Sequence, residues 1–168
     1  MSKKDYQNLE TLCVQAGYDP KSGEPRIAPI VQSTTFKYDK TQTVADLFDL
    51  KESGFFYTRL GNPTIDALEQ RVAALDGGAA AVATSSGQSA SLNAVLNITN
   101  AGDNIVVLNN IYGGTYNLFG TTLKNWGIEA RFVPSNDLEA AEKQIDDKTT
   151  LVYGEVLANP STAILDIE

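Results

Sequence analysis

Short apolar runs alternate with segments of helical pattern from residue 79 onward, and this alternation constrains the fold more than any other feature of the sequence. Each run has the length of a strand and few polar positions, as expected for strands covered on both faces. The strand–helix order predicts crossover connections and a largely parallel sheet, and therefore an α/β fold. The predicted strands are 79–84, 104–108, 128–134 and 149–155, and the predicted helices run from Ser85 to about Asn100, from about Thr115 to Trp126, and from a capping box at Asn136 and Glu139 to about Ile145.

The segment before this alternation divides near residue 60. Asn62 is a suitable N-cap, Pro63 fits the first helical position, and Gly77-Gly78 ends the predicted helix. Residues 1–60 contain repeated Pro and Gly and no periodic face, so we expect an extended N-terminal arm that lies on the rest of the chain or on a second subunit. Residues 61–168 form the α/β domain. The apolar face of its first helix consists of Ile65, Leu68, Val72 and Leu75.

Composition argues against several classes of protein. The net charge of −8 leaves no basic patch for nucleic acid or an anionic membrane surface. The sequence contains no run of about 18 apolar residues, so it predicts no membrane span. Its start contains lysines but lacks the apolar core of a signal peptide. A single cysteine, Cys13, and the lack of histidine exclude a disulfide framework, His-ligated zinc and Ser-His-Asp hydrolysis, so no metal is expected. These observations favour a cytoplasmic protein.

The loops that follow the predicted strands contain the candidate site residues, because open parallel sheets bind ligands beyond the carboxyl ends of their strands. Ser86, Gly87 and Gln88 join the first predicted strand to a helix, where free N–H groups and the helix dipole favour a phosphate. Gly87 lets such a group approach the backbone closely. An ordinary turn with a serine N-cap explains the same residues, and neither a Walker motif nor GxGxxG is present.

Aromatic and basic residues add to this candidate site. Tyr112 follows the second predicted strand beside Gly113 and Gly114, where its ring can stack on a planar ligand; a tyrosine half buried under a loop is the alternative. Tyr57 and Arg59 precede the first long helix, and an arginine with a tyrosine hydroxyl makes a good phosphate clamp. A single surface arginine is more often only solvated.

Two polar residues follow the fourth predicted strand. Glu155 ends that strand, and Asn159 comes four residues later. A carboxylate and an amide at this position can orient the polar substituents of a ring, whereas a helix or turn cap is the alternative interpretation.

The order and spacing of these segments resemble those of the Cys/Met-metabolism family of pyridoxal-phosphate (PLP) enzymes, which includes cystathionine γ-synthase, methionine γ-lyase and O-acetylhomoserine sulfhydrylase. The resemblance implies the aspartate-aminotransferase-like fold (PLP-dependent transferase fold type I), with this chain an incomplete large domain. SSGQ with YGGT is more similar to the O-acetylhomoserine sulfhydrylases than to the γ-lyases. The matching stretches are PIVQSTTF (29–36), YTRLGNPTIDALEQRVAALDGG (57–78), SSGQSA (85–90), GDNIVVLNNIYGGTYNLF (102–119) and GEVLANPS (154–161).

The resemblance implies roles for the residues after the first two predicted strands. Ser86, Gly87 and Gln88 would bind the PLP phosphate, the last two through backbone N–H groups. Tyr112 would stack on the pyridine ring and assist proton movements, which makes it the catalytic residue of this chain.

The remaining candidates would act from other segments. Tyr57 and Arg59 would reach the phosphate of the neighbouring subunit's cofactor in a homo-oligomer such as a homotetramer, which accounts for the N-terminal arm. Asn159 would lie near the 3′-oxygen of the ring, with Glu155 supporting the site.

The implied activity of the intact enzyme is γ-replacement, in which acetate leaves the γ-carbon of O-acetylhomoserine and sulfide or a thiol adds to give homocysteine or an analogue. Methionine γ-lyase or cystathionine γ-synthase activity is the alternative within the family. The family's ring-nitrogen aspartate and cofactor-holding lysine lie downstream of the Glu-x-x-x-Asn segment, and the chain ends at Glu168 before both. We therefore expect a fragment without turnover of its own. A non-catalytic self-associating fragment and a phospholigand-binding module unrelated to PLP are the other two hypotheses.

Overall fold

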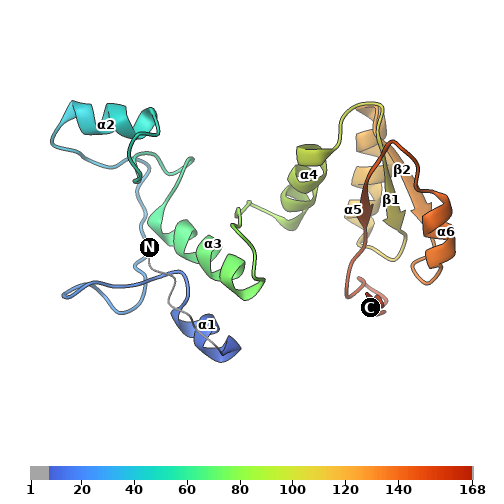
Figure 1. Cartoon of the computed structure of the whole chain (residues 1–168), viewed down its shortest axis with the longest axis horizontal. Helices are drawn as coiled ribbons and strands as arrows, with labels where there is room; N and C mark the ends of the chain where they lie inside the picture. The colour runs from blue at the N-terminus through green and yellow to red at the C-terminus, as the bar shows by residue number, and fades with distance from the viewer. Residues whose placement is uncertain (1–7, 168) are drawn as a thin grey trace. The chain divides into compact units, whose positions relative to one another are not determined.

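The structure is a computed structural model that describes residues 8–167, and it consists of two compact units, Met1–Ala83 and Thr84–Glu168 (Figure 1). The long helix after residue 62 groups with the preceding segment, and the division near residue 60 into an intersubunit arm and an α/β domain stays a prediction. Within residues 8–167, no helix has the length and apolar character needed to span a membrane. The first unit contains α1 (Leu9–Gln15), α2 (Thr41–Phe48) and α3 (Pro63–Leu75); the second contains α4 (Gly87–Ile98), β1 (Asn104–Leu108), α5 (Gly113–Asn117), the π-helix η1 (Leu118–Leu123), β2 (Glu129–Val133), α6 (Leu138–Lys143) and β3 (Thr149–Tyr153).

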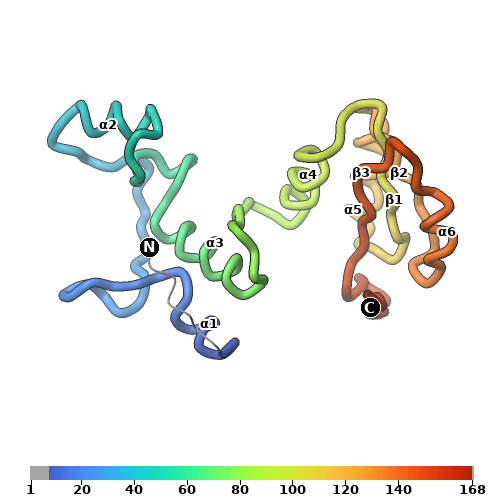
Figure 2. Tube along the Cα trace, viewed as in Figure 1, coloured from blue at the N-terminus to red at the C-terminus, as the bar shows by residue number. Residues whose placement is uncertain are grey.

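The second unit is built on a parallel sheet with the order β2-β1-β3, whose three strands lie side by side in Figure 2. All five residues of the central strand β1 are buried. Ile105 and Val107 pack with α4 and η1, whereas Val106 and Leu108 pack on the other face with β2 and α6. Alternate side chains of one strand therefore enter two apolar layers, and the predicted parallel sheet covered on both faces is confirmed.

Two helix starts agree with the sequence. The Asn62 side chain accepts a hydrogen bond from the Thr64 N–H at 2.9 Å, and Pro63 is the first residue of α3. The Ser86 hydroxyl accepts a hydrogen bond from the Ser89 N–H at 3.1 Å at the start of α4. Both helices begin where a polar side chain satisfies an N–H group that has no carbonyl partner within the helix.

The prediction that residues 1–60 are irregular is wrong for two segments, which form the short helices α1 and α2. The contact that stabilises α1 comes from a residue distant in sequence. Its last carbonyl groups need donors, and the Arg71 guanidinium of α3 supplies them: Nε donates to the Ala16 carbonyl at 2.8 Å and Nη2 to the Val14 carbonyl at 3.5 Å. No local pattern reveals a cap that comes from 55 residues away.

Two further local predictions are wrong. Residues 79–84 form no strand, because an apolar run becomes a strand only beside a partner, and the three strands of the described chain pair only with one another. The capping box at Asn136 and Glu139 is absent: Asp137 is the N-cap of α6, and its carboxylate accepts from the Ala140 N–H at 2.9 Å. Aspartate is as good an N-cap as asparagine, so the start of α6 lies one residue later than predicted.

The helical segment after β1 and the helix α3 also differ in detail from the sequence prediction. The segment predicted from about Thr115 begins at Gly113 as α5 and continues as the π-helix η1, and Gly127 takes a positive φ of 81° after it. On α3, Ile65, Leu68 and Val72 are 39–54% exposed, whereas the small residues Ala67 and Ala73 are buried. Within its unit, α3 packs on α1 through small residues and leaves most of its apolar face open.

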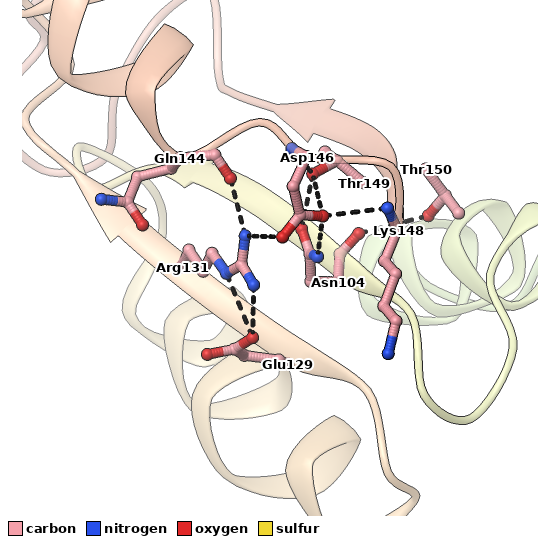
Figure 3. A network of polar contacts seen from close by, with 8 residues as sticks. All are labelled: Asn104, Glu129, Arg131, Gln144, Asp146, Lys148, Thr149 and Thr150. Carbon is pink, nitrogen blue, oxygen red and sulfur yellow. Dashed lines mark hydrogen bonds and ion pairs between the residues drawn. The ribbon is translucent and has the colours of Figure 1, made fainter.

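A polar network joins the three strands at their amino ends (Figure 3). The Arg131 guanidinium forms ion pairs with Glu129 at 2.9 Å and with Asp146 at 2.8 Å. Asn104, which is buried, donates to the Asp146 carboxylate at 2.8 Å and accepts from the Thr149 hydroxyl at 2.7 Å. The hydrogen bond from Asn104 and the one from Arg131 hold the pKa of Asp146 well below its ordinary value.

We expect this carboxylate to make the second unit acid-sensitive. Because its pKa is lower in the folded chain than in the unfolded chain, its stabilising effect is complete above its ordinary pKa of 3.8 and is lost as the pH falls further. Urea titrations followed by circular dichroism between pH 6 and pH 2.5 should show a smaller loss of stability in Asp146→Asn than in the wild type. Glu139→Gln removes an exposed pair with Lys143 and should follow the wild type. Parallel curves for all three proteins would contradict the role of Asp146.

Candidate functional site

The candidate residues of the second unit gather at the carboxyl ends of its strands, opposite the network of Figure 3. Ser86 caps α4, as the alternative interpretation had it, so its hydroxyl is already engaged by the Ser89 N–H. Gly87 is the first residue of α4, and a Cβ atom added there would meet no atom within 4 Å. The space beside the first residue of α4 is therefore open, and an anion can approach the start of this helix there.

Gln88 and Tyr112 come together around Gly114. The Gln88 amide donates to the buried Thr115 hydroxyl at 3.1 Å. A Cβ atom at Gly114 would lie 2.5 Å from Cε1 of Tyr112 and 2.9 Å from Nε2 of Gln88, so both side chains border the same glycine. Tyr112 is 48% exposed as a whole residue, which leaves surface that a ligand can contact.

The loop after β3 is attached to the loop after β1. Glu155 accepts a hydrogen bond from the Tyr112 backbone N–H at 3.0 Å, and the Ser161 hydroxyl bonds the Asn110 side chain at 3.0 Å. Asn159 is exposed in the turn between these two contacts. Two segments 43 residues apart in sequence thus meet at the carboxyl ends of the strands.

A pocket opens beside Glu155. Neither Gln88 nor Tyr112 contributes to its wall; Leu108 and Leu165 of its lining belong to the apolar layer that covers the α6 face of the sheet. Glu155 therefore lies between this pocket and the backbone of Tyr112. The lining residues are Leu108, Asn109, Asn110, Ser135, Asn136, Glu155, Ala163, Ile164 and Leu165.

Tyr57 and Arg59 lie in the first unit, in the loop before α3. The Arg59 guanidinium lies over the Tyr57 ring, 5.2 Å from its centroid, which is a cation–π contact. Backbone pairing between Thr35 and Tyr57 joins this loop to the extended segment 29–36. The two candidate residues therefore form a pair, held by an extended chain that runs alongside.

Asn62 and Thr64 fasten that extended chain to the start of α3. The Asn62 amide donates to the Val31 carbonyl at 3.0 Å and to the Thr58 hydroxyl at 3.2 Å. The Thr64 hydroxyl accepts from the Val31 N–H and donates to the Pro29 carbonyl, both at 2.9 Å. The start of α3 thus fixes the loop that carries Tyr57 and Arg59.

Comparison with known proteins identifies the family. The profile of the Cys/Met metabolism PLP-dependent enzymes matches residues 10–168. The chain belongs to this family. Within the family it is 47% identical to the O-acetyl-L-homoserine sulfhydrylase of Leptospira meyeri over 94% of this chain and 36% of that protein. It is 40% identical to the homocysteine/cysteine synthase of Saccharomyces cerevisiae over 96% of this chain and 37% of that protein. The chain spans about two fifths of the length of these relatives.

Solved structures of the family share the fold. The chain superposes with a TM-score of 0.87 and 42% identity on a putative O-acetylhomoserine (thiol)-lyase from Campylobacter jejuni that contains a pyridoxyl-lysine phosphate, covering 95% of this chain and 40% of that one. For the cystathionine γ-lyase of Lactobacillus plantarum the TM-score is 0.79 and the identity 31%, over 94% and 39% of the two chains. The expected PLP-dependent transferase fold type I is therefore confirmed.

The residues at the carboxyl ends of the strands fit the phosphate and ring of PLP. Gly87 leaves open space before the first turn of α4, and the exposed Tyr112 ring offers an aromatic face near the Gln88 amide. The Glu155 carboxylate accepts a hydrogen bond from the Tyr112 N–H, so its charge is partly compensated.

Sequence reasoning named Gly114 as a neighbour of Tyr112 but missed the other residues that support the candidates. Thr115 anchors the Gln88 amide, Gly114 leaves room for the Tyr112 ring, and Asn110 binds the loop after β3. Asn62, which was assigned only as a helix cap, also holds the loop of the Tyr57 and Arg59 pair. A hydroxyl, a glycine and an amide within three residues of Tyr112 were the available signal, but the hydroxyl and the amide bond to side chains that are distant in sequence.

Proposed function

We propose that the whole protein catalyses PLP-dependent γ-replacement, converting O-acetylhomoserine and sulfide or a thiol into homocysteine or an analogue and acetate. The observation that carries the proposal is the convergence of Gln88, Tyr112 and Glu155 at one edge of the sheet of a family member. The relatives named O-acetyl-L-homoserine sulfhydrylase and homocysteine/cysteine synthase support this activity over the γ-lyase alternative. A cytoplasmic location is part of the same proposal.

Residues of the second unit hold the cofactor and orient it. The first-turn N–H groups of Gly87 and Gln88 bind the phosphate, because the start of α4 concentrates unpaired donors and the positive end of the helix dipole. The Tyr112 ring would stack on the pyridine, and its hydroxyl would move a proton at the substrate carbons. Asn159 would lie near the 3′-oxygen. PLP supplies the electron sink for the reaction when it is bound.

Residues of the first unit act across a subunit boundary in a homo-oligomer. Arg59 and Tyr57 bind the phosphate of the neighbouring subunit's cofactor, since a guanidinium and a phenol both donate to phosphate oxygens. The contact between them pre-orders the guanidinium, so less side-chain entropy is lost when the anion binds.

PLP titrations of the 168-residue chain, followed by the absorbance of the cofactor, test the binding part of the proposal. Tyr112→Ala should weaken PLP binding about two- to tenfold, the range expected for loss of one aromatic stack. Tyr116→Ala is the matched control, because Tyr116 is a similarly exposed tyrosine four residues away that stacks on Phe132 instead. Unchanged PLP affinity in both Tyr112→Ala and Arg59→Ala would favour a phospholigand-binding module unrelated to PLP.

Turnover is expected only together with the further segment that the longer relatives possess. A thiol assay on the purified 168-residue chain with O-acetylhomoserine, sulfide and PLP should give no homocysteine above the rate with free PLP alone. A rate above that background, abolished by Tyr112→Phe, would show that this region is catalytically competent by itself.

A further inference from the structure

In its present orientation, the ring of Tyr112 occupies space that a side chain at position 114 would enter. A Cβ atom on Gly114 would lie 2.5 Å from Cε1 and 3.2 Å from Cδ1 of the Tyr112 ring. Carbon atoms in proteins pack at about 3.5–4.0 Å, so a methyl group there and the ring cannot occupy their present positions together. Gly114 has no positive φ. Its backbone conformation suits any residue, and the requirement for glycine is one of space.

The neighbouring glycine of the same helix has no such requirement. A Cβ atom on Gly113 would meet nothing within 4 Å. Both glycines lie in α5, and alanine is favoured over glycine in a helix by about 1 kcal/mol. The pair therefore separates the effect of the added methyl group on the Tyr112 ring from its effect on the helix.

The backbone of Tyr112 is fixed from two sides. Its N–H donates to Oε1 of Glu155 at 3.0 Å, and its carbonyl accepts from the Tyr116 N–H at 3.0 Å. The first contact comes from two residues past the end of β3, and a hydrogen bond to a carboxylate is stronger than one between neutral groups. Glu155 thus sets the direction in which the side chain of Tyr112 leaves the backbone, and the space at Gly114 sets where its ring lies.

We propose that Gly114 and Glu155 are positioning residues that hold the exposed ring of Tyr112 in one orientation, ready to face a bound pyridine ring. The proposal rests on the proposed function for the identity of the ligand, but the orientation itself is a property of the ligand-free chain. Gln88 borders the same space, because its amide nitrogen would lie 2.9 Å from a Cβ atom on Gly114. In this proposal Glu155 acts through Tyr112 and does not bind the cofactor directly.

The first experiment compares Gly114→Ala with Gly113→Ala in the cofactor-free 168-residue chain. The ring of Tyr112 is observed by fluorine NMR after incorporation of 3-fluorotyrosine, and its signal is identified by its loss in Tyr112→Phe. Gly114→Ala should shift this signal while Gly113→Ala leaves it in place, and both variants should melt at or above the temperature of the wild type. Equal positions of the signal in all three proteins, or equal shifts in both variants, would overturn the role of Gly114.

The second experiment separates positioning from direct contact at Glu155. The amide oxygen of Glu155→Gln can still accept from the Tyr112 N–H, whereas Glu155→Ala cannot. The Tyr112 amide proton signal should therefore move in Glu155→Ala and stay close to its wild-type position in Glu155→Gln. PLP affinity should fall about two- to tenfold in Gly114→Ala and Glu155→Ala, the cost of an off-rotamer ring, and largely recover in Glu155→Gln.

Two results distinguish a failure of the positioning role from a failure of the proposed function. If Glu155→Gln weakens PLP binding as much as Glu155→Ala, the charge itself acts on the cofactor and the positioning role is overturned. If the wild type binds no PLP, the proposed function of this region fails, but the ring and amide signals of the cofactor-free chain still decide whether Gly114 and Glu155 orient Tyr112.

Discussion

Replacing Gly17 with alanine is expected to detach α1 from α3 and to destabilise the first unit by about 3 kcal/mol or more. Gly17 has a φ of +83°, a conformation that costs energy for any residue with a side chain. A Cβ atom there would also collide with the Ala67 carbonyl oxygen and lie 3.0 Å from the backbone nitrogen of Arg71 in α3. Backbone atoms inside a helix cannot move aside as a flexible side chain can, so α1 must move away.

Gly23→Ala is the matched control for this prediction. Gly23 has a similar φ of +88°, but a Cβ atom there would meet nothing within 4 Å. Its cost should be limited to the backbone conformation, about 1–2 kcal/mol. Hydrogen exchange of the α1 and α3 amides reports the local stability of each variant. Equal exchange rates in the two variants would show that the close approach of Gly17 to α3 is not needed for the docking of α1.

Truncation of Phe119 to alanine should have the largest effect on the second unit, about 3–5 kcal/mol. Phe119 is fully buried between the sheet and its helices, with its ring edge-on to Tyr153 of β3 at 4.8 Å. The Tyr153 hydroxyl in turn bonds Ser91 of α4 at 3.1 Å. A cavity at Phe119 therefore loosens the contact between β3 and α4. Because a domain is typically stable by only about 5–15 kcal/mol, much of this unit should be unfolded at moderate temperature.

Tyr116→Ala serves as the control, since Tyr116 is also aromatic and lies three residues earlier. Its ring stacks on Phe132 at 4.2 Å but remains 45% exposed, so its truncation should cost about 1 kcal/mol. Urea unfolding followed by circular dichroism gives both values. A loss for Phe119→Ala as small as that for Tyr116→Ala would mean that the core relaxes around the missing ring.

The parts of the fold that the sequence predicted are those whose signals are local. β1 is a run of apolar residues, and α3 and α4 begin with polar caps that their own first turn uses, so pattern and capping residue were enough. α1 was missed because its carbonyl groups are satisfied by Arg71 from a distant helix. Residues 79–84 were assigned as a strand because apolar character indicates burial but does not supply a pairing partner.

The same limit applies to the candidate site. Motif resemblance pointed to Gln88, Tyr112 and Glu155, and the structure brings these three together. What the sequence could not reveal is that the Glu155 carboxylate bonds the backbone of Tyr112, because that contact depends on two strands ending at the same edge of the sheet. For Glu155 we propose a role through Tyr112 in place of a direct contact with the cofactor. The other cofactor-binding assignments stay predictions that the PLP titrations address: Tyr57, Arg59, Ser86, Gly87, Gln88, Tyr112 and Asn159.

The attachment of segment 29–36 to the start of α3 has a consequence for assembly. Asn62 begins the helix and at the same time holds the Val31 carbonyl, so the loop with Tyr57 and Arg59 cannot rearrange without loosening the first turn of α3. Ordering a free loop of this kind costs conformational entropy at the moment two molecules meet. Here that cost is met during folding, and in the proposed homo-oligomer a second subunit would receive the aromatic and cationic pair in a conformation that is already fixed.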